Sequence, residues 1–165
     1  MLTIRRAVPA DEEALGRFGG DLMRQHHAAD PKRFIEVTNP ERGYGRFLVS
    51  QLHNEEMCVL VADVDGSPAG YVLAGREETS WMDLRGPCGI IHDIYIDAAA
   101  RRHGAGRALL RAALDWIRSK GEHQVVLFTR PDNTAAQRVF GSVGFRPTMI
   151  EMTLDLDPAA ASPDE

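Results

Sequence analysis

Two polar side chains interrupt an otherwise apolar stretch in the middle of the chain, GIIHDIYI at residues 89–96, and both could move protons. The imidazole of His92 belongs to a class with an unperturbed pKa of about 6.5, which suits a general base near neutral pH. Asp93 is the second candidate. Neighbouring side chains on a strand point to opposite faces, so only one of the two should face a substrate unless a bulge intervenes. The alternative is a structural role, as a satisfied polar group on a half-buried strand.

The next segment, AAARRHGAG at residues 98–106, joins this apolar stretch to a helical pattern. A helix N-terminus presents unpaired N–H groups and a positive dipole end, and it binds phosphate oxygens. Gly104 and Gly106 remove side chains that would keep a diphosphate from the backbone. Arg101, Arg102 and Arg107 add positive charge at the same place. The segment therefore predicts a polyphosphate site.

Two common nucleotide sites do not fit this segment. A Walker P-loop needs Lys and then Ser or Thr after its last glycine, whereas Arg107 and Ala108 follow here. A dinucleotide-binding turn needs a third glycine where Leu109 stands. It also needs a carboxylate at the end of the next strand, which ends at Phe128 and Thr129. Both nucleotide-binding interpretations are disfavoured.

Composition narrows the class of protein. The 165 residues suit one domain, and the net charge of −5 argues against a general nucleic-acid binder. Cys58 and Cys88 do not form a C-x-x-C pair, so they are expected to be reduced, buried thiols, and no metal site is predicted. The first residues lack the apolar core of a signal peptide, and no apolar run could cross a bilayer. We expect a cytoplasmic protein that does not bind membranes.

Hydrophobic periodicity predicts the elements that position these residues. Strands are expected at residues 2–6, 57–62, 69–74, 89–96, 124–129 and 148–156. Helices are expected from about residue 9 to 25 and at 41–53, 104–120 and 133–143, with a loop at 26–39. The order indicates an α/β (α+β) fold with a mixed sheet. One domain should span residues 1–156, followed by a disordered tail at 157–165.

Three motifs in order resemble the GNAT (N-acetyltransferase) superfamily. RRHGAG at residues 101–106 resembles its acetyl-CoA signature, IRRAVPADEEAL at 4–15 its first strand and helix, and NTAAQRVFGSVGF at 133–145 its later motif. The resemblance implies a mostly antiparallel central sheet flanked by helices. It implies a cofactor site comprising Ile94, Tyr95, Ile96, Arg101, Arg102, His103, Gly104, Ala105, Gly106, Arg107, Asn133 and Phe140. In that family the loop amides hold the CoA pyrophosphate, and the strand edge, often bulged, pairs with the pantetheine arm.

The implied activity is transfer of an acetyl group from acetyl-CoA to a primary amine. HDIYI resembles polyamine-type members, which favours a small-molecule amine, with a protein amine as the other acceptor class. His92 and Asp93 would be the catalytic pair. Many relatives carry a Tyr acid where this chain has Phe140, and the alternative tyrosines are Tyr44, Tyr71 and Tyr95, with no preference among them. Thiols have a pKa near ~8.5, so a thiolate can also leave unassisted. Loss of that hydroxyl favours the alternative, a non-catalytic CoA-binding sensor. A homodimer, as in many relatives, is a further expectation.

Overall fold

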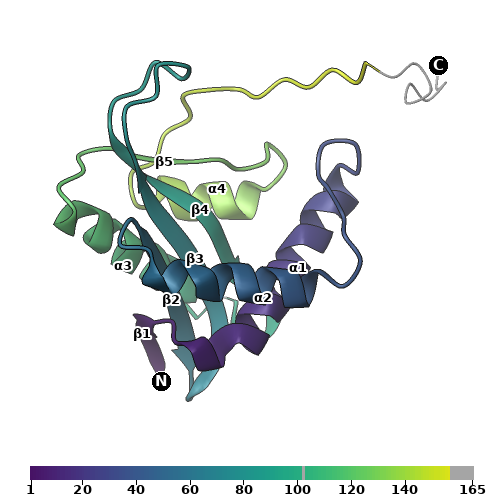
Figure 1. The fold of residues 1–165 in the computed structure, drawn as a ribbon, viewed down its shortest axis with the longest axis vertical. Helices are drawn as coiled ribbons and strands as arrows, with labels where there is room; N and C mark the ends of the chain where they lie inside the picture. The colour runs from purple at the N-terminus through teal and green to yellow at the C-terminus, as the bar shows by residue number, and fades with distance from the viewer. Residues whose placement is uncertain (102, 157–165) are drawn as a thin grey trace.

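Five strands form one mixed sheet in the computed structural model, which describes residues 1–101 and 103–156 (Figure 1). The strands are β1 (Leu2–Arg6), β2 (Met57–Val64), β3 (Ser67–Glu77), β4 (Cys88–Ile96) and β5 (Val125–Leu127). They lie in the order β1-β2-β3-β4-β5, antiparallel except for the parallel pair β4–β5. The predicted α/β fold with a mostly antiparallel sheet is confirmed.

Helices cover both faces of the sheet. They are α1 (Glu12–Ala29), α2 (Pro40–Ser50), α3 (Ala105–Ser119) and α4 (Thr134–Gly141). Alternate side chains of β2 enter different cores. Cys58 and Leu60 face the core that includes α3 and Phe140 of α4, and Val59 and Val61 face the core that includes α1 and α2. The two sides are called the α3 side and the α1 side below.

The hairpin between β2 and β3 has a two-residue turn. Asp65 and Gly66 have φ angles of 51° and 84°, which fits the type I′ turn that matches strand twist. The predicted turn at residues 65–68 is therefore shorter than expected, because β3 already begins at Ser67. The strand then runs to Glu77, three residues past its predicted end.

Helices α1 and α2 touch through their backbones. A Cβ added to Gly16 would lie 2.3 Å from the carbonyl oxygen of Glu41, and one added to Gly45 would lie 2.5 Å from that of Glu12. Neither distance is sterically possible for a real side chain. The two glycines therefore allow an approach that no other residue type would permit.

Replacing Gly16 with alanine is expected to lower the free energy of unfolding by about 1–3 kcal/mol, because overpacking forces the helices apart. The matched control is Gly43→Ala on the exposed face of α2, where an added Cβ meets nothing within 4 Å. That change should stabilise the helix by up to about 1 kcal/mol. Urea unfolding of the three proteins tests the contrast, and equal midpoints for Gly16→Ala and the parent would contradict it.

The loop predicted at residues 26–39 begins later than expected. Helix α1 continues to Ala29, so His26 and His27 lie in its last turn. His26 Nδ1 lies 2.9 Å from the carbonyl oxygen of Leu22, one turn earlier, and its ring packs edge-on against Phe34 at 4.8 Å. These contacts extend the helix past the point where apolar periodicity ends.

The strand predicted at residues 148–156 is wrong. This segment pairs with no strand of the described chain, and it leaves the body beyond α4 (Figure 1). Its apolar side chains are 81–90% exposed at Met149, Ile150, Met152 and Leu154. A strand needs a neighbour with free main-chain groups, and β5 has only three residues instead of the predicted six. The predicted tail at 157–165 lies outside the described residues.

Candidate active site

Strand β4 separates from β5 halfway along its length. The parallel register runs only from Gly89 opposite Val125 to Ile91 opposite Leu127. Further along, the N–H of Asp97 donates to a carbonyl of β3 at 2.9 Å. Main-chain groups alternate in direction along an antiparallel strand. The main-chain N–H and C=O groups of Ile94 and Ile96 therefore point away from β3, toward the side where β5 has ended. Among the described residues, the far half of β4 thus has an edge that no strand pairs with, although the carbonyl oxygen of Ile96 accepts from the side chain of Arg101.

A β-bulge lies at the point where β4 leaves β5. Leu73 of β3 is opposite Asp93, but its neighbour Ala74 is opposite Ile91, so His92 is the extra residue. The side chains of Ile91 and Ile94 both pack on the α3 side although they are three positions apart. The extra residue thus shifts the alternation of the strand, as a bulge beside a functional site commonly does.

The bulge places His92 and Asp93 on the same face of the sheet. Asp93 Oδ2 accepts a hydrogen bond from Tyr71 Oη, and Tyr71 belongs to the α1-side core. A Cβ built on Gly75, four residues further along β3 and therefore on the same face, would lie 3.0 Å from His92 Nε2. Regular alternation predicted opposite faces, and the bulge removes that restriction. Asp93 is half-buried, and His92 is exposed.

Two tyrosines converge on the Asp93 carboxylate. Tyr44 Oη of α2 donates to Oδ2 at 2.7 Å, and Tyr71 Oη donates to the same oxygen at 3.0 Å. Burial, and then the charge of Asp93, raise the pKa of both phenols well above the ordinary value. Both hydroxyls therefore remain protonated donors at neutral pH. The sequence indicated these tyrosines only as possible acids, because nothing local relates them to Asp93.

Helix α3 begins beside the open edge of β4. Gly104 precedes it with a φ of 78°, a conformation that favours glycine. The first intrahelical hydrogen bond runs from the N–H of Ala108, so the N–H groups of Ala105, Gly106 and Arg107 have no acceptor among the described residues. Among the described residues, a Cβ on Gly106 would meet only Ile96 Cγ1, at 3.6 Å, so none of them covers the surface above these amides closely.

Positive charge surrounds this helix start. Arg101 is exposed, and its Nε donates to the carbonyl oxygen of Ile96 at 3.1 Å, on the free edge of β4. Arg107 is also exposed. His103 Nδ1 lies 3.4 Å from the carbonyl oxygen of Ala100. The predicted site residue Arg102 lies outside the described residues.

Three of the other predicted cofactor residues have roles within the fold. The ring of Tyr95 is buried on the α1 side, and its backbone lies opposite that of Tyr71. Asn133 Oδ1 caps α4 by accepting from the N–H of Ala136 at 3.2 Å. Phe140 is 7% exposed and packs against Phe145, with ring centroids 6.1 Å apart. Contact of these residues with a cofactor stays a prediction.

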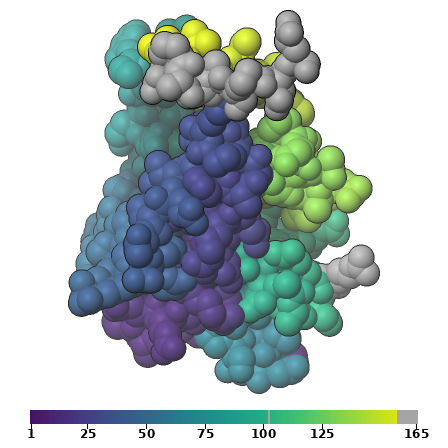
Figure 2. Space-filling model, turned by 90° about the vertical axis from the view of Figure 1, so that its right-hand side faces the viewer, coloured from purple at the N-terminus to yellow at the C-terminus, as the bar shows by residue number. Residues whose placement is uncertain are grey.

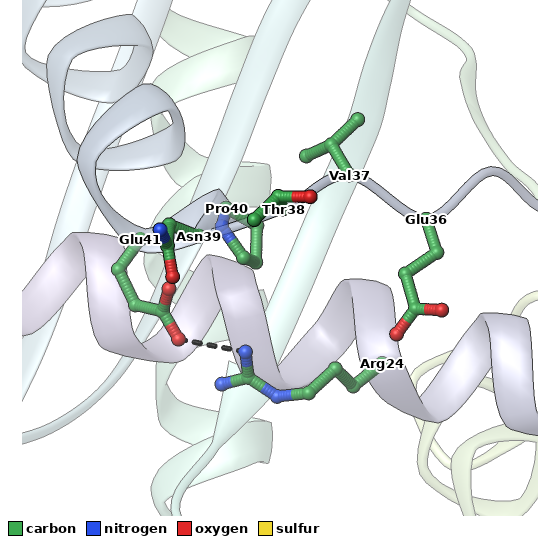
Figure 3. Close-up of a pocket in the computed structure, with 7 residues that line it drawn as sticks. All are labelled: Arg24, Glu36, Val37, Thr38, Asn39, Pro40 and Glu41. Atoms are coloured by element: carbon green, nitrogen blue, oxygen red, sulfur yellow. Dashed lines mark hydrogen bonds and ion pairs between the residues drawn. The ribbon is translucent and has the colours of Figure 1, made fainter.

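A hollow of about 390 Å³ lies between α1 and the chain entering α2. Figure 3 shows Arg24 reaching across its floor to Glu41, with Glu36 at the opposite end. The ion pair of Arg24 and Glu41 measures 2.6 Å, and Glu36 lies 3.3 Å from His27 Nε2. No periodic sequence pattern indicated this hollow, because it depends on the fold of the connecting loop.

The site suits an extended anionic ligand. The open amides and arginines at the start of α3 fit a diphosphate, and the free edge of β4 fits an arm with amide groups. Figure 2 views this side of the molecule, with the green start of α3 and the yellow-green α4 beside α1. Within the described residues no cluster of metal-ligating side chains occurs. Over the same ranges, no helix is long and apolar enough to span a membrane.

The chain resembles known acetyltransferases. The sequence profile of the Acetyltransferase (GNAT) family matches residues 21–145. A mycothiol acetyltransferase from Thermobispora bispora is 38% identical over 89 residues, which make up 47% of this chain and 30% of the relative. The chain thus spans less than a third of that relative and also of a second mycothiol acetyltransferase, from Nocardia farcinica.

Solved structures share the fold. A mutant of the BH1408 protein from Bacillus halodurans has a TM-score of 0.78 at 22% identity, covering 93% of this chain and 99% of that chain. Aminoglycoside N-acetyltransferase AAC(6')-Iy in complex with CoA has a TM-score of 0.73 at 18% identity, covering 94% of each chain. At these identities the likeness concerns the fold alone.

Proposed function

Because the chain belongs to the GNAT acetyltransferase family, we propose that it transfers the acetyl group of acetyl-CoA to a primary amine. The observation that carries the proposal is the unpaired edge of β4 next to the unpaired amides at the start of α3. A CoA molecule has a diphosphate and an arm with two amide groups, and these two features match it in order. Acetyl-CoA supplies an acetyl group activated as a thioester.

The residues divide into a cofactor part and an acceptor part. The amides of Ala105, Gly106 and Arg107 hold the diphosphate, with Arg101 adding charge. The free main-chain groups of Ile94 and the N–H of Ile96, whose carbonyl oxygen accepts from Arg101, pair with the arm and orient the thioester. His92 and Asp93, which lie together on the α1 side, bind the amine and accept its proton. The amine must lose this proton before its lone pair can attack. All three tyrosines belong to or pack against the α1-side core, away from Phe140 on the α3 side, so the thiolate leaves without a tyrosine acid from there.

A small-molecule amine is the favoured acceptor, and a protein amine is the second class. The name of the mycothiol acetyltransferase and that of the aminoglycoside N-acetyltransferase both concern small molecules, which supports the first class. We place the reaction in the cytoplasm, without nucleic-acid or membrane partners and without a metal.

The test is thiol release from acetyl-CoA in the presence of a panel of amines: a polyamine, an aminoglycoside, an amino sugar, an amino-acid amide and a lysine peptide. Calorimetry with acetyl-CoA and with CoA runs in parallel. Transfer to an amine of the panel supports the enzyme. Tight CoA binding without any transfer would favour a CoA-binding sensor, the alternative suggested by the hydroxyl missing at Phe140.

A homodimer is also proposed, with the C-terminal segment of one copy as an added strand on another copy. Ile150, Met152 and Leu154 alternate with polar residues and are exposed, and no described residue pairs with the outer edge of β5. Such a segment, together with a free sheet edge, is the arrangement that strand exchange requires.

Light scattering after gel filtration is expected to give twice the chain mass of 18.2 kDa. Leu154→Asp should give the monomer mass, because a charge would enter the buried face of the added strand. Thr153→Asp adds the same charge on the opposite face and should remain dimeric. A monomeric parent protein, or identical behaviour of both variants, would refute this arrangement.

A further inference from the structure

Among the described residues, every buried or half-buried carboxylate except that of Asp93 forms an ion pair with an arginine. Eight aspartate or glutamate side chains in the described ranges are not exposed. Seven pair with an arginine at 2.6–2.8 Å: Asp11, Asp21, Glu41, Asp63, Glu77, Asp97 and Glu122. Asp93 is the eighth, and no lysine, arginine or histidine of the described chain forms an ion pair with it. A half-buried carboxylate without a cation is unfavourable unless something else compensates its charge.

The two tyrosine hydroxyls compensate only one oxygen of Asp93. Tyr44 and Tyr71 both donate to Oδ2, and Oδ1 has no hydrogen-bond partner among the described residues. Oδ1 is not sealed inside the protein, since among those residues only the Nε of Arg85 is both buried and unpartnered. Asp93 thus presents one fixed, accessible oxygen that still needs a donor.

The surrounding packing holds the two phenols in place. Tyr71 is fully buried, and Phe18 of α1 stacks on its ring with an interplanar angle of 10°. The ring of Tyr44 lies against Gly19, where an added Cβ would be 2.1 Å from Tyr44 Cδ1. Because α1 and α2 pack so closely, the ring of Tyr44 is held where its hydroxyl reaches Asp93 on the sheet. A carboxylate held from two elements, β3 and α2, has little freedom to turn.

We infer that Asp93 binds the amino group of the acceptor through Oδ1, and that Tyr44 and Tyr71 are positioning residues that hold the carboxylate for it. The inference rests on the proposed function and deepens it, because it makes a cationic nitrogen the group that the site recognises. The acceptor's ammonium is the counter-ion that this carboxylate otherwise lacks. It also separates the roles of the two candidate catalytic residues.

His92 takes the proton in this arrangement. The bulge places it on the same face as Asp93, and it is exposed, so its imidazole can exchange protons with water. An N–H bond of the ammonium breaks and an imidazole N–H bond forms, and the nitrogen keeps the electron pair that attacks the thioester. Asp93 keeps the nitrogen in place during this step.

Tyr44→Phe removes one hydroxyl and keeps the ring. We expect the KM for the amine to rise roughly tenfold, the loss of one hydrogen bond to a charged group, with kcat and the KM for acetyl-CoA near those of the parent. Asp93→Asn should raise the KM for the amine further. Adding Tyr44→Phe to Asp93→Asn should change nothing more, because the hydroxyl acts through the carboxylate. Ser50→Ala removes an exposed hydroxyl from the same helix and serves as the control.

A second measurement needs no turnover. The chain has three tyrosines, so labelling with ¹³C at Cζ gives three NMR signals. Adding the best amine of the panel, or spermidine if none is acetylated, should shift the signals of Tyr44 and Tyr71 and leave that of Tyr95 in place. Asp93→Asn should abolish both shifts.

The outcomes separate the inference from the proposed function. Shifts without acetylation of any amine would support the cation site and refute the acetyltransferase. Acetylation with an unchanged amine KM in Asp93→Asn would overturn the inference and leave the enzyme in place. An effect of Tyr44→Phe that persists in full in the Asp93→Asn background would also overturn it, as would the absence of any shift in the parent protein.

Discussion

His92→Ala is expected to lower kcat by about 10²–10⁴-fold, the contribution of a well-placed general base. The loss should depend on pH. An imidazole acts as a base only when it is neutral. Turnover of the parent should therefore rise with pH and level off once the base is neutral. In the variant this levelling should disappear, because turnover would then follow the fraction of free amine in solution, which keeps rising with pH.

The pH dependence of kcat at saturating acetyl-CoA measures this effect. His123→Ala removes an exposed histidine of the segment before β5 and should leave the profile of the parent unchanged. A His92→Ala profile that levels off at the same pH as that of the parent would exclude this residue as the base. Rescue by added imidazole would support a role in proton transfer over one in packing.

The second large effect is expected at the start of α3. Gly106→Val should weaken acetyl-CoA binding roughly a hundredfold, because the side chain would keep the diphosphate from amides that each donate a charge-assisted hydrogen bond, worth about 1.5–3 kcal/mol. The fold should tolerate the change, since within the described part of the chain a Cβ here is in ordinary contact with one atom only, Ile96 Cγ1 at 3.6 Å.

Calorimetry with acetyl-CoA measures this loss. Gly43→Val is the control, the same substitution on the exposed face of α2, and it should leave affinity unchanged. Gly104 is the poorer test position, because its φ of 78° would strain any other residue and mix a folding defect with the binding defect. Unchanged affinity in Gly106→Val would place the diphosphate elsewhere.

Sequence patterns predicted the parts of the fold that depend on local chemistry. The apolar runs of β2 and β3, and the glycines at the start of α3, each express a preference within a few residues, and the structure has all three elements close to the expected places. The interrupted strand at residues 89–96 was also found, with one further residue at its start. Local pattern was enough wherever a residue's partner lies nearby in the chain.

The remainder depends on distant partners. Tyr44 and Asp93 are 49 positions apart, and only the packing of α2 across the sheet joins them. The last turn of α1 is stabilised by contacts of His26 that no helical periodicity signals. The segment at residues 148–156 has a clear two-residue pattern but pairs with no strand among the described residues. Pattern shows that a segment could be a strand, and pairing decides whether it is one.

The bulge in β4 makes the length of that strand as important as its composition. One additional residue converts a repeat of two into a step of three, so Ile91 and Ile94 anchor the same core while two polar side chains project together on the other side. Deleting a single residue from this stretch would restore regular alternation. Either Ile91 or Ile94 would then point to the α1 side, or His92 and Asp93 would no longer lie on the same face. Substitutions here could be gradual in effect, whereas a one-codon deletion would be abrupt.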